Sequence, residues 1–322
     1  MRHIASQFLI TLALLGSAAL AQAALAGCSE SEQSSASAGG ASPGGAASAD
    51  SSDVRIVMSA AFVSESGVGI YEKIAGYLTR TTGVKAEFVS GLAYGTINSM
   101  IETGKVECGF ICGYPYVLLH DRDQPAAELL VAPVMKAPRY GGKPKYFSDL
   151  IVKKDSPFQS LQDLKGRTYV YNDELSNSGY NMPRFRMLQL GLTGGFFGKV
   201  LRSGSHEESI RMVATGEADA SYVDSLVIDY DREKHLGHAD QVRVVESIGP
   251  AGVCPMVASS AMPAALRQKF QEQLARMHED PEGRKILDEA LIDRFVVVDD
   301  TNYDDIRSMK AAAEKAGFTT IR

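Results

Sequence analysis

Apolar segments with the spacing of strands alternate with segments of helical spacing along most of this chain. The run Val54–Met58 is short, apolar and rich in β-branched residues, as buried strands are. Apolar residues recur at helical spacing in Gly69–Thr82, and Gly83 ends the pattern. Further elements of the same alternation are predicted at 84–89, 94–103 and 106–112. Strand and helix in alternation predict an α/β fold with a mainly parallel sheet flanked by helices.

The same alternation starts afresh in the second half of the chain. Its predicted elements lie at 161–166, 168–171, 180–190, 199–202, 206–215 and 218–224. Other extended segments and helices are predicted at 129–135, 147–152, 242–246, 254–259, 263–277 and 281–291. We therefore predict two α/β lobes, one at 53–152 and 248–322 and the other at 153–247. Two hinge strands would join the lobes, and a cleft would lie between them.

The first 27 residues have the features of a secretory signal peptide. Arg2 and His3 give a positive start, residues 8–15 are almost entirely apolar, and small residues follow up to Gly27. The apolar core is too short to span a bilayer comfortably. We therefore expect an exported protein.

The sequence Leu25-Ala-Gly-Cys28 resembles the lipobox of bacterial lipoproteins. The resemblance implies that Cys28 is lipidated and anchors the mature chain to a membrane, in the periplasm or cell envelope outside the cytoplasmic membrane. The alternative is ordinary cleavage after 21–23, which leaves Cys28 as a spare thiol. Residues 28–52 are rich in Ser, Gly and Ala, and we expect them to form a flexible tether.

The sequence also argues against several kinds of protein. The formal net charge is −6, and no basic stripe with interleaved aromatic residues occurs, so nucleic acid is not an expected partner. Neither His-x-x-x-His nor Cys-x-x-Cys spacing occurs, and we expect no metal and no cofactor. Ser178, His206 and Asp224 are the residue types of a hydrolase triad. However, Ser178 does not lie in a Gly-x-Ser-x-Gly elbow, so we do not expect an enzyme.

A polar segment, Ser176-Asn177-Ser178-Gly179, lies between a predicted strand and a predicted helix. Ser and Asn are good helix caps, and the free N–H groups of a first helical turn attract anions. His206 begins another predicted helix, and Asp224 ends the next predicted strand. These segments all follow strands, and ligands of such sheets bind at the carboxyl ends of the strands. The segment, His206 and Asp224 are therefore candidates for an anion site, although each could also be only a helix cap.

Residues from the first predicted lobe also follow strands. Ala60 comes after the first strand, and Tyr114 and Tyr116 come after the third. A tyrosine offers an apolar wall and a hydroxyl donor to a half-polar ligand. We expect these residues to face the cleft, with a core aromatic as the alternative for each tyrosine.

Almost the whole folded part resembles the phosphate, phosphite and phosphonate binding proteins of ABC importers. The resemblance rests on six motifs in order: Gly104-Lys-Val-Glu-Cys108, Leu161-Gln-Asp-Leu-Lys-Gly166, Ser176-Asn-Ser-Gly179, Gly204-Ser-His206, Val223-Asp-Ser225 and Ile248-Gly-Pro250. It implies a two-lobed, hinged type II periplasmic-binding fold. It also implies a monomer that captures a small oxyanion and passes it to a membrane permease with its ATPase.

The resemblance also implies roles for the site residues. Ser176, Asn177, Ser178 and Gly179 would hold the oxyanion, and His206 would complete the shell. Asp224 would take an amino or protonated hydroxyl group of the ligand. Tyr114 or Tyr116 would close on the ligand from the other lobe.

Three further cysteines depart from the usual pattern of this family. Cys108 and Cys112 would lie about 13 Å apart along a strand, too far to pair with each other. The usual strand order of the fold makes Cys112 and Cys254 neighbours, as a disulfide or as inert buried thiols. The other possibility is a thiophilic ligand such as arsenite. A branch of the family senses arsenite for a membrane histidine kinase, and both roles stay open at this point.

Overall fold

The computed structural model describes residues 53–59 and 65–322. The predicted signal peptide, Cys28, the tether at 28–52 and Ala60 lie outside these residues. Within the described part of the chain, no helix combines the length and apolarity needed to cross a bilayer.

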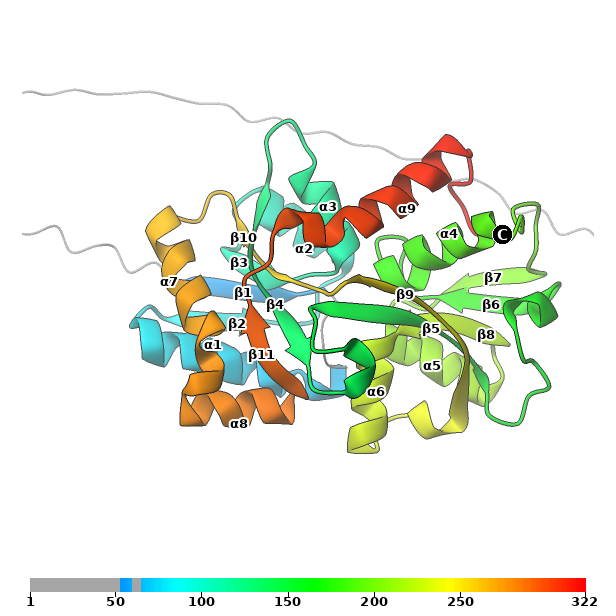
Figure 1. The fold of residues 1–322 in the computed structure, drawn as a ribbon, viewed down its shortest axis with the longest axis horizontal. Helices are drawn as coiled ribbons and strands as arrows, with labels where there is room; N and C mark the ends of the chain where they lie inside the picture. The colour runs from blue at the N-terminus through cyan, green and yellow to red at the C-terminus, as the bar shows by residue number, and fades with distance from the viewer. Residues whose placement is uncertain (1–52, 60–64) are drawn as a thin grey trace, which may run out of the picture. The chain divides into compact units, whose positions relative to one another are not determined.

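Six strands form the first sheet, in the order β11-β4-β10-β3-β1-β2. Their bounds are β1 Val54–Met58, β2 Ala86–Val89, β3 Cys108–Phe110, β4 Ala127–Met135, β10 Met256–Ser259 and β11 Ile292–Val296. Strand β1 pairs in parallel with β2 and β3, whereas β10 runs antiparallel to β3 and β4, and β11 antiparallel to β4. Five helices accompany this sheet: α1 Gly69–Thr82, α2 Tyr94–Glu102, α3 Gly113–His120, α7 Ala264–Ala275 and α8 Pro281–Glu289. In Figure 1, α1, α7 and α8 lie to one side of the sheet and α2 and α3 to the other.

Five strands form the second sheet, in the order β7-β6-β8-β5-β9. Their bounds are β5 Lys145–Lys153, β6 Thr168–Tyr171, β7 Lys199–Arg202, β8 Ala220–Asp224 and β9 Val242–Gly252. Strand β6 pairs in parallel with β7 and β8, and β5 runs antiparallel to β8 and β9. The helices of this part are α4 Met182–Gln189, α5 His206–Thr215 and α6 Ser225–Lys234. Short helical turns lie at Glu65–Gly67, Pro138–Tyr140, Leu161–Leu164, Asn177–Asn181, Ala239–Gln241, Met277–Glu279 and Asp300–Tyr303.

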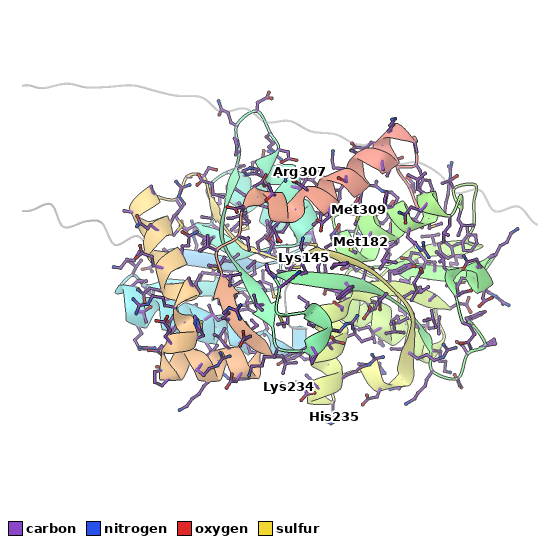
Figure 2. All side chains as sticks on the ribbon, viewed as in Figure 1. Lys145, Met182, Lys234, His235, Arg307 and Met309 are labelled. Atoms are coloured by element: carbon purple, nitrogen blue, oxygen red, sulfur yellow. The ribbon has the colours of Figure 1, made fainter. Side chains whose placement is uncertain are left out.

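The C-terminal helix α9, Asp304–Lys315, connects the two parts. It packs along α4, and Met309 of α9 and Met182 of α4 line one small pocket (Figure 2). Beyond the helix, Phe318 and Ile321 are buried in the hydrophobic core of the second sheet. The predicted division between the lobes stays a prediction. Its boundaries fall at the C-terminal end of β5 and within β9.

The predicted α/β architecture with two sheets is confirmed. The largest difference concerns the predicted strand at 106–112, of which only Cys108–Phe110 is a strand. Cys112 has extended backbone and precedes α3, a helix that was not predicted. The proline at position 115 lies in the first turn of α3, where the missing N–H group costs nothing. Strand β11 and helix α9 were also not predicted.

Candidate ligand-binding site

The segment Ser176–Gly179 lies after β6 and opens a π-helical turn that leads into α4. The Ser176 hydroxyl caps this turn by accepting the N–H of Gly179 at 3.0 Å. From β5, the Ser148 hydroxyl donates to the carbonyl oxygen of Ser178 at 2.6 Å. The turn is buried, so its position is fixed by packing as well as by these bonds.

Gly179 is required by the close approach of a neighbouring carboxamide. A Cβ atom built on Gly179 would lie 1.8 Å from Oδ1 of Asn172. Asn172 itself follows β6 and is fully buried, and its Nδ2 donates to the Tyr94 hydroxyl at 3.3 Å. Its Oδ1 has no hydrogen-bond partner among the residues that the structure describes. Asn172 therefore contributes a buried acceptor that sequence reasoning did not single out.

His206, at the first turn of α5, meets Ser178 and Asp224. The backbone N–H of Asp224 donates to Nδ1 of His206 at 3.4 Å, which leaves Nε2 to carry the imidazole proton, and Nε2 also lies 3.3 Å from Nδ2 of Asn172. Nε2 lies 3.4 Å from the Ser178 hydroxyl oxygen, and that oxygen lies 3.5 Å from Oδ2 of Asp224. Burial lowers the pKa of His206 to about 3, so the imidazole is neutral at pH 7. Three residues predicted from separate segments are thus brought together.

Asp224 ends β8 and is almost fully buried. Its Oδ1 accepts the backbone N–H of Leu226 at 2.8 Å and so caps α6. Burial raises the pKa of this carboxyl well above its ordinary value, although the hydrogen bond from Leu226 acts in the opposite direction. Its Oδ2 faces Ser178 and also the thiol of Cys254, whose sulfur lies 3.9 Å away. Asp224 is therefore placed to hold or share a proton.

Cys112, which follows β3 of the first sheet, contacts this cluster through its sulfur atom. The backbone N–H of Asn177 donates to the sulfur of Cys112 at 3.2 Å, and Nδ2 of Asn177 donates to the Tyr146 hydroxyl at 3.0 Å. Cys112 and Cys254 form one buried group with Tyr94, and both are free thiols. Cys108 is also free and is buried in the core of the first sheet, where burial raises its pKa.

Burial alone would raise the pKa of Cys112, but several hydrogen bonds outweigh it. The sulfur interacts with the thiol of Cys254 and accepts hydrogen bonds from the backbone N–H groups of Asn177 and Tyr114 and from the hydroxyl of Tyr146. Together these interactions lower the pKa of Cys112 below its ordinary value. The Cys112 thiolate therefore forms at a lower pH than that of an ordinary cysteine.

The side chains of the two tyrosines singled out from the sequence lie outside this cluster, although the backbone N–H of Tyr114 donates to Cys112. The Tyr116 hydroxyl donates to Oδ1 of Asp300 at 2.6 Å, and its ring packs against Tyr303. The Tyr114 side chain belongs to the core of the first sheet. Tyr94, the first residue of α2, lies in the cluster instead. The rule that ligand groups follow strands would have found Tyr94, since it opens the helix that comes after β2.

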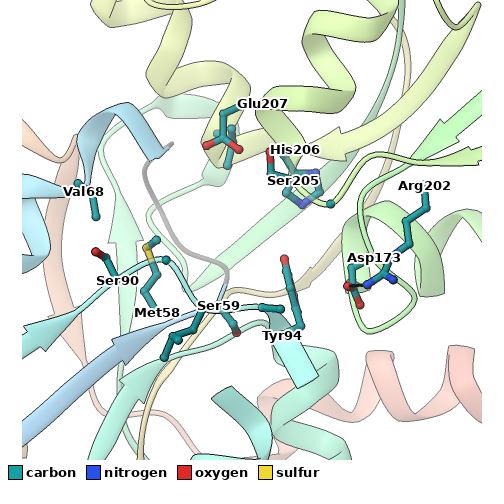
Figure 3. A pocket seen from close by; sticks show the side chains of 15 residues that line it. Met58, Ser59, Val68, Ser90, Tyr94, Asp173, Arg202, Ser205, His206 and Glu207 are labelled. Atoms are coloured by element: carbon teal, nitrogen blue, oxygen red, sulfur yellow. Dashed lines mark hydrogen bonds and ion pairs between the residues drawn. The ribbon is translucent and has the colours of Figure 1, made fainter. Parts of the chain in front are cut away.

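A cavity of 480 Å³ lies beside the cluster and shares Tyr94 and His206 with it. It is lined by Met58, Ser59, Val68, Ser90, Gly91, Leu92, Ala93, Tyr94, Asp173, Arg202, Gly204, Ser205, His206, Glu207 and Val227. In Figure 3, Met58, Ser59 and Ser90 lie on one side of the cavity, and Ser205, His206 and the ion pair of Arg202 with Asp173 lie across from them. The cavity is therefore bounded by residues associated with both sheets.

The donor set of the cluster does not match a metal site. Among the described residues, no three His, Cys, Asp or Glu side chains are grouped as metal ligands. The groups present are neutral hydrogen-bond donors, one carboxyl and one thiol pair. Such a set suits a small polar ligand that is held by hydrogen bonds.

Comparisons with known proteins agree with the fold. A family model described as "ABC transporter, phosphonate, periplasmic substrate-binding protein" matches residues 56–303. A binding-protein component of an ABC phosphonate transporter from Pseudomonas aeruginosa is 20% identical, with a TM-score of 0.74 over 84% of this chain and 89% of that chain. PhnD1 from Prochlorococcus marinus, in complex with methylphosphonate, is 15% identical, with a TM-score of 0.72 over 83% and 99%. XAC2383 from Xanthomonas citri, bound to ATP, is 19% identical, with a TM-score of 0.63 over 84% and 99%.

Proposed function

Because the chain belongs to the family of periplasmic substrate-binding proteins of phosphonate ABC transporters, we propose that it captures a small oxyanion of the phosphonate, phosphite or phosphate type. The ligand would be delivered to the permease and ATPase of an importer. The observation that carries this proposal is the convergence of Ser178, His206 and Asp224 within 3.5 Å of one another, next to the capped turn. The chain would act as a monomer.

The cluster provides donors that suit an oxyanion. The Ser178 hydroxyl, the Nε2–H group of His206 and the Tyr94 hydroxyl are neutral donors from three different elements. Donors that are already oriented in a buried site bind an anion strongly, because they do not have to leave water first. The N–H groups at the start of the turn add a partial positive charge.

The remaining polar groups suit a ligand that still carries a proton. The Asp224 carboxyl and the unpartnered Oδ1 of Asn172 are acceptors that a P–OH or an amino group would satisfy. A buried acceptor without a donor is unfavourable, so each of these contacts would add to the affinity.

The adjacent cavity supports a ligand with an organic substituent. A volume of 480 Å³ falls within the range of small-molecule sites, about 300–1,000 Å³. A phosphonate head group has far fewer atoms than this volume holds. Leu92, Val227 and Met58 give the cavity an apolar side, and Ser59 and Ser90 give it hydroxyl groups.

The same three residues support binding rather than catalysis. A hydrolase triad needs a histidine that takes the serine proton near neutral pH. His206, with a pKa of about 3, is a poor base at pH 7 and serves better as a neutral donor. Lipidation of Cys28 remains part of the proposal, since it would hold the protein beside its membrane partner.

Thermal unfolding of the protein with a panel of anions tests this function. The panel contains phosphate, phosphite, methylphosphonate, aminoethylphosphonate, arsenate and arsenite. A ligand at a hundred times its Kd stabilises a protein by about 2.7 kcal/mol, which is a clear rise in Tm. If none of the phosphorus oxyanions raises Tm, the proposed function is refuted. A rise with arsenite alone would favour the arsenite-sensing role instead.

A substitution in the cluster and a matched control outside it test which residue binds the anion. Ser178→Ala should weaken binding of the anion that raises Tm by roughly tenfold, the effect of losing one hydrogen bond to a charged group. Ser221→Ala removes an equally buried serine on β8 whose hydroxyl, among the described residues, bonds to the Tyr222 carbonyl alone, and affinity should stay unchanged.

A further inference from the structure

Cys112 and Cys254 face each other across two antiparallel segments. In the register of β3 and β10, Phe110 pairs with Met256, and Cys112 falls opposite Cys254 two residues further on. Between these pairs, the N–H of Ile111 donates to the carbonyl oxygen of Pro255 at 3.0 Å. The cysteines therefore occupy the next position, where the backbones do not bond to each other. Cα atoms at such positions lie about 4.5 Å apart, a separation that a disulfide can bridge.

The two sulfurs are also chemically unequal. Cys112 precedes the first turn of α3 and accepts several hydrogen bonds, so it is the better thiolate of the two. The Cys254 thiol donates to Oδ2 of Asp224 at 3.9 Å, and its interaction with Cys112, followed by burial, raises the pKa of Cys254. A thiolate beside a second thiol is the arrangement in which disulfide exchange proceeds. Proteins of the periplasm meet conditions in which disulfides form and persist.

The Cys112 sulfur also connects the two parts of the binding site. It precedes α3 of the first sheet, yet it accepts the N–H of Asn177 in the turn after β6 of the second sheet. That N–H lies at the start of the turn proposed to hold the oxyanion. The sulfur therefore occupies a donor that an anionic ligand would otherwise use, and as a thiolate it repels such a ligand.

We propose that Cys112 and Cys254 form a reversible dithiol–disulfide site that sets the affinity of the cleft for oxyanions. In the reduced protein, the Cys112 thiolate holds the Asn177 N–H and opposes anion binding. In the oxidised protein, the disulfide is uncharged and releases that N–H to the ligand. The effect on affinity rests on the proposed function, whereas formation of the disulfide does not.

The chemical step is an exchange with an external disulfide, R–S–S–R. The Cys112 thiolate attacks one sulfur of R–S–S–R and expels the other as a thiolate. The Cys254 thiol then loses its proton and attacks the mixed disulfide at Cys112, and the second R–S⁻ leaves. The Cys112–Cys254 bond forms, two electrons pass to R–S–S–R, and two R–SH molecules result after protonation.

The disulfide itself is tested by mass spectrometry of the full chain. The folded protein is equilibrated in buffers of reduced and oxidised glutathione, alkylated and digested. We expect a linked peptide that joins the segments carrying Cys112 and Cys254, and its loss on addition of dithiothreitol. Cys108→Ala should retain the link and Cys254→Ser should abolish it. If both cysteines remain open to alkylation in unfolded samples from the most oxidising buffer, the dithiol site does not exist.

The effect on affinity is tested by calorimetry with methylphosphonate and phosphite. At pH 8 the oxidised protein should bind roughly tenfold more tightly than the reduced protein, as expected for one regained hydrogen bond to a charged group. At pH 6 the difference should be smaller, because more of the reduced sulfur is then protonated and no longer repels the anion, although it still accepts the Asn177 N–H. Cys254, Tyr146, Tyr94 and Asp224 also face Cys112. Reduced Cys112→Ser keeps these neighbours and the acceptor for the Asn177 N–H but cannot form a thiolate, so its affinity should match that of the reduced wild type at pH 6 and should not fall further at pH 8.

The outcomes separate the two proposals. Equal affinities of the oxidised and reduced protein at pH 8 would overturn the coupling. If neither form binds any phosphorus oxyanion, the proposed function and the coupling both fail, and the linked peptide still decides whether the dithiol site exists.

Discussion

Burial of His206 predicts how the stability of the protein depends on pH. The unfolded chain binds a proton on this histidine near its ordinary pKa of 6.5, and the folded protein binds it only near 3. The contribution of this group to stability is therefore complete above pH 6.5 and is lost as the pH falls toward 3. Between pH 7 and pH 5 the unfolded state gains about one proton at this site, which destabilises the folded protein by about 2 kcal/mol.

Urea unfolding of the wild type and of His206→Gln at both pH values isolates this contribution. The wild type should lose about 2 kcal/mol more than the variant between pH 7 and pH 5. Asp224, whose raised pKa acts with the opposite sign, and all other carboxyl groups are present in both proteins. His235→Asn, at a side chain that is 84% exposed, controls for the loss of a histidine as such. Equal pH dependence of the wild type and His206→Gln would refute the reasoning, because the histidine would then be accessible to protons in the folded state.

Three further predictions concern packing and specificity. Gly179→Ala should destabilise the protein by about 1–3 kcal/mol and abolish the ligand-induced rise in Tm, whereas Gly194→Ala, with nothing within 4 Å of its Cβ, should do neither. Arg139→Leu leaves the carboxylate of fully buried Asp149 without its bidentate partner, at 2.8 and 3.0 Å, and should cost about 3–5 kcal/mol in urea unfolding at pH 7. Leu92→Trp fills part of the cavity and should weaken binding of a phosphonate with a bulky substituent, measured by calorimetry, while phosphite binding stays the same. Equal loss for both ligands would mean that the substituent does not enter this cavity.

The regular part of the fold could be predicted from hydrophobic spacing. Gly69–Thr82 and Lys199–Arg202 have the predicted bounds, because local pattern and end signals agree there. The family resemblance, inferred from six short motifs, is confirmed by the match over 56–303. Strand β11 was missed because its sequence, Ile292-Asp-Arg-Phe-Val, has only two fully buried side chains, and its pairing with β4 is a distant contact.

The site could be predicted in part, for a reason that the geometry makes plain. Ser178, His206 and Asp224 meet because each lies at or after the carboxyl end of a strand of one sheet, and the strand order brings these ends together. The same rule was applied to the residues directly after β3, and the role predicted for Tyr114 or Tyr116 stays a prediction. Tyr116 lies on the first turn of an unpredicted helix and points to Asp300, whereas Tyr94 opens α2. Asn172 carried no signal, since only the contact with Gly179 reveals its role.

The charges around the cluster limit the ligand more sharply than its shape does. His206 is neutral, and the other titratable neighbours of Ser178 and Asn177, which are Asp224, Cys112 and Tyr146, can only be neutral or negative. A dianionic ligand would therefore be repelled by the negative charge of these groups unless the site binds protons together with the ligand. The Asp224 carboxyl, whose pKa is raised, can supply one such proton. Alternatively, it accepts a hydrogen bond from a ligand that brings its own proton. Binding should thus favour a monoanion, or binding of a dianion should be accompanied by uptake of a proton. Calorimetry in buffers of different ionisation enthalpy measures the number of protons taken up. This number should be larger for a dianion than for a monoanion.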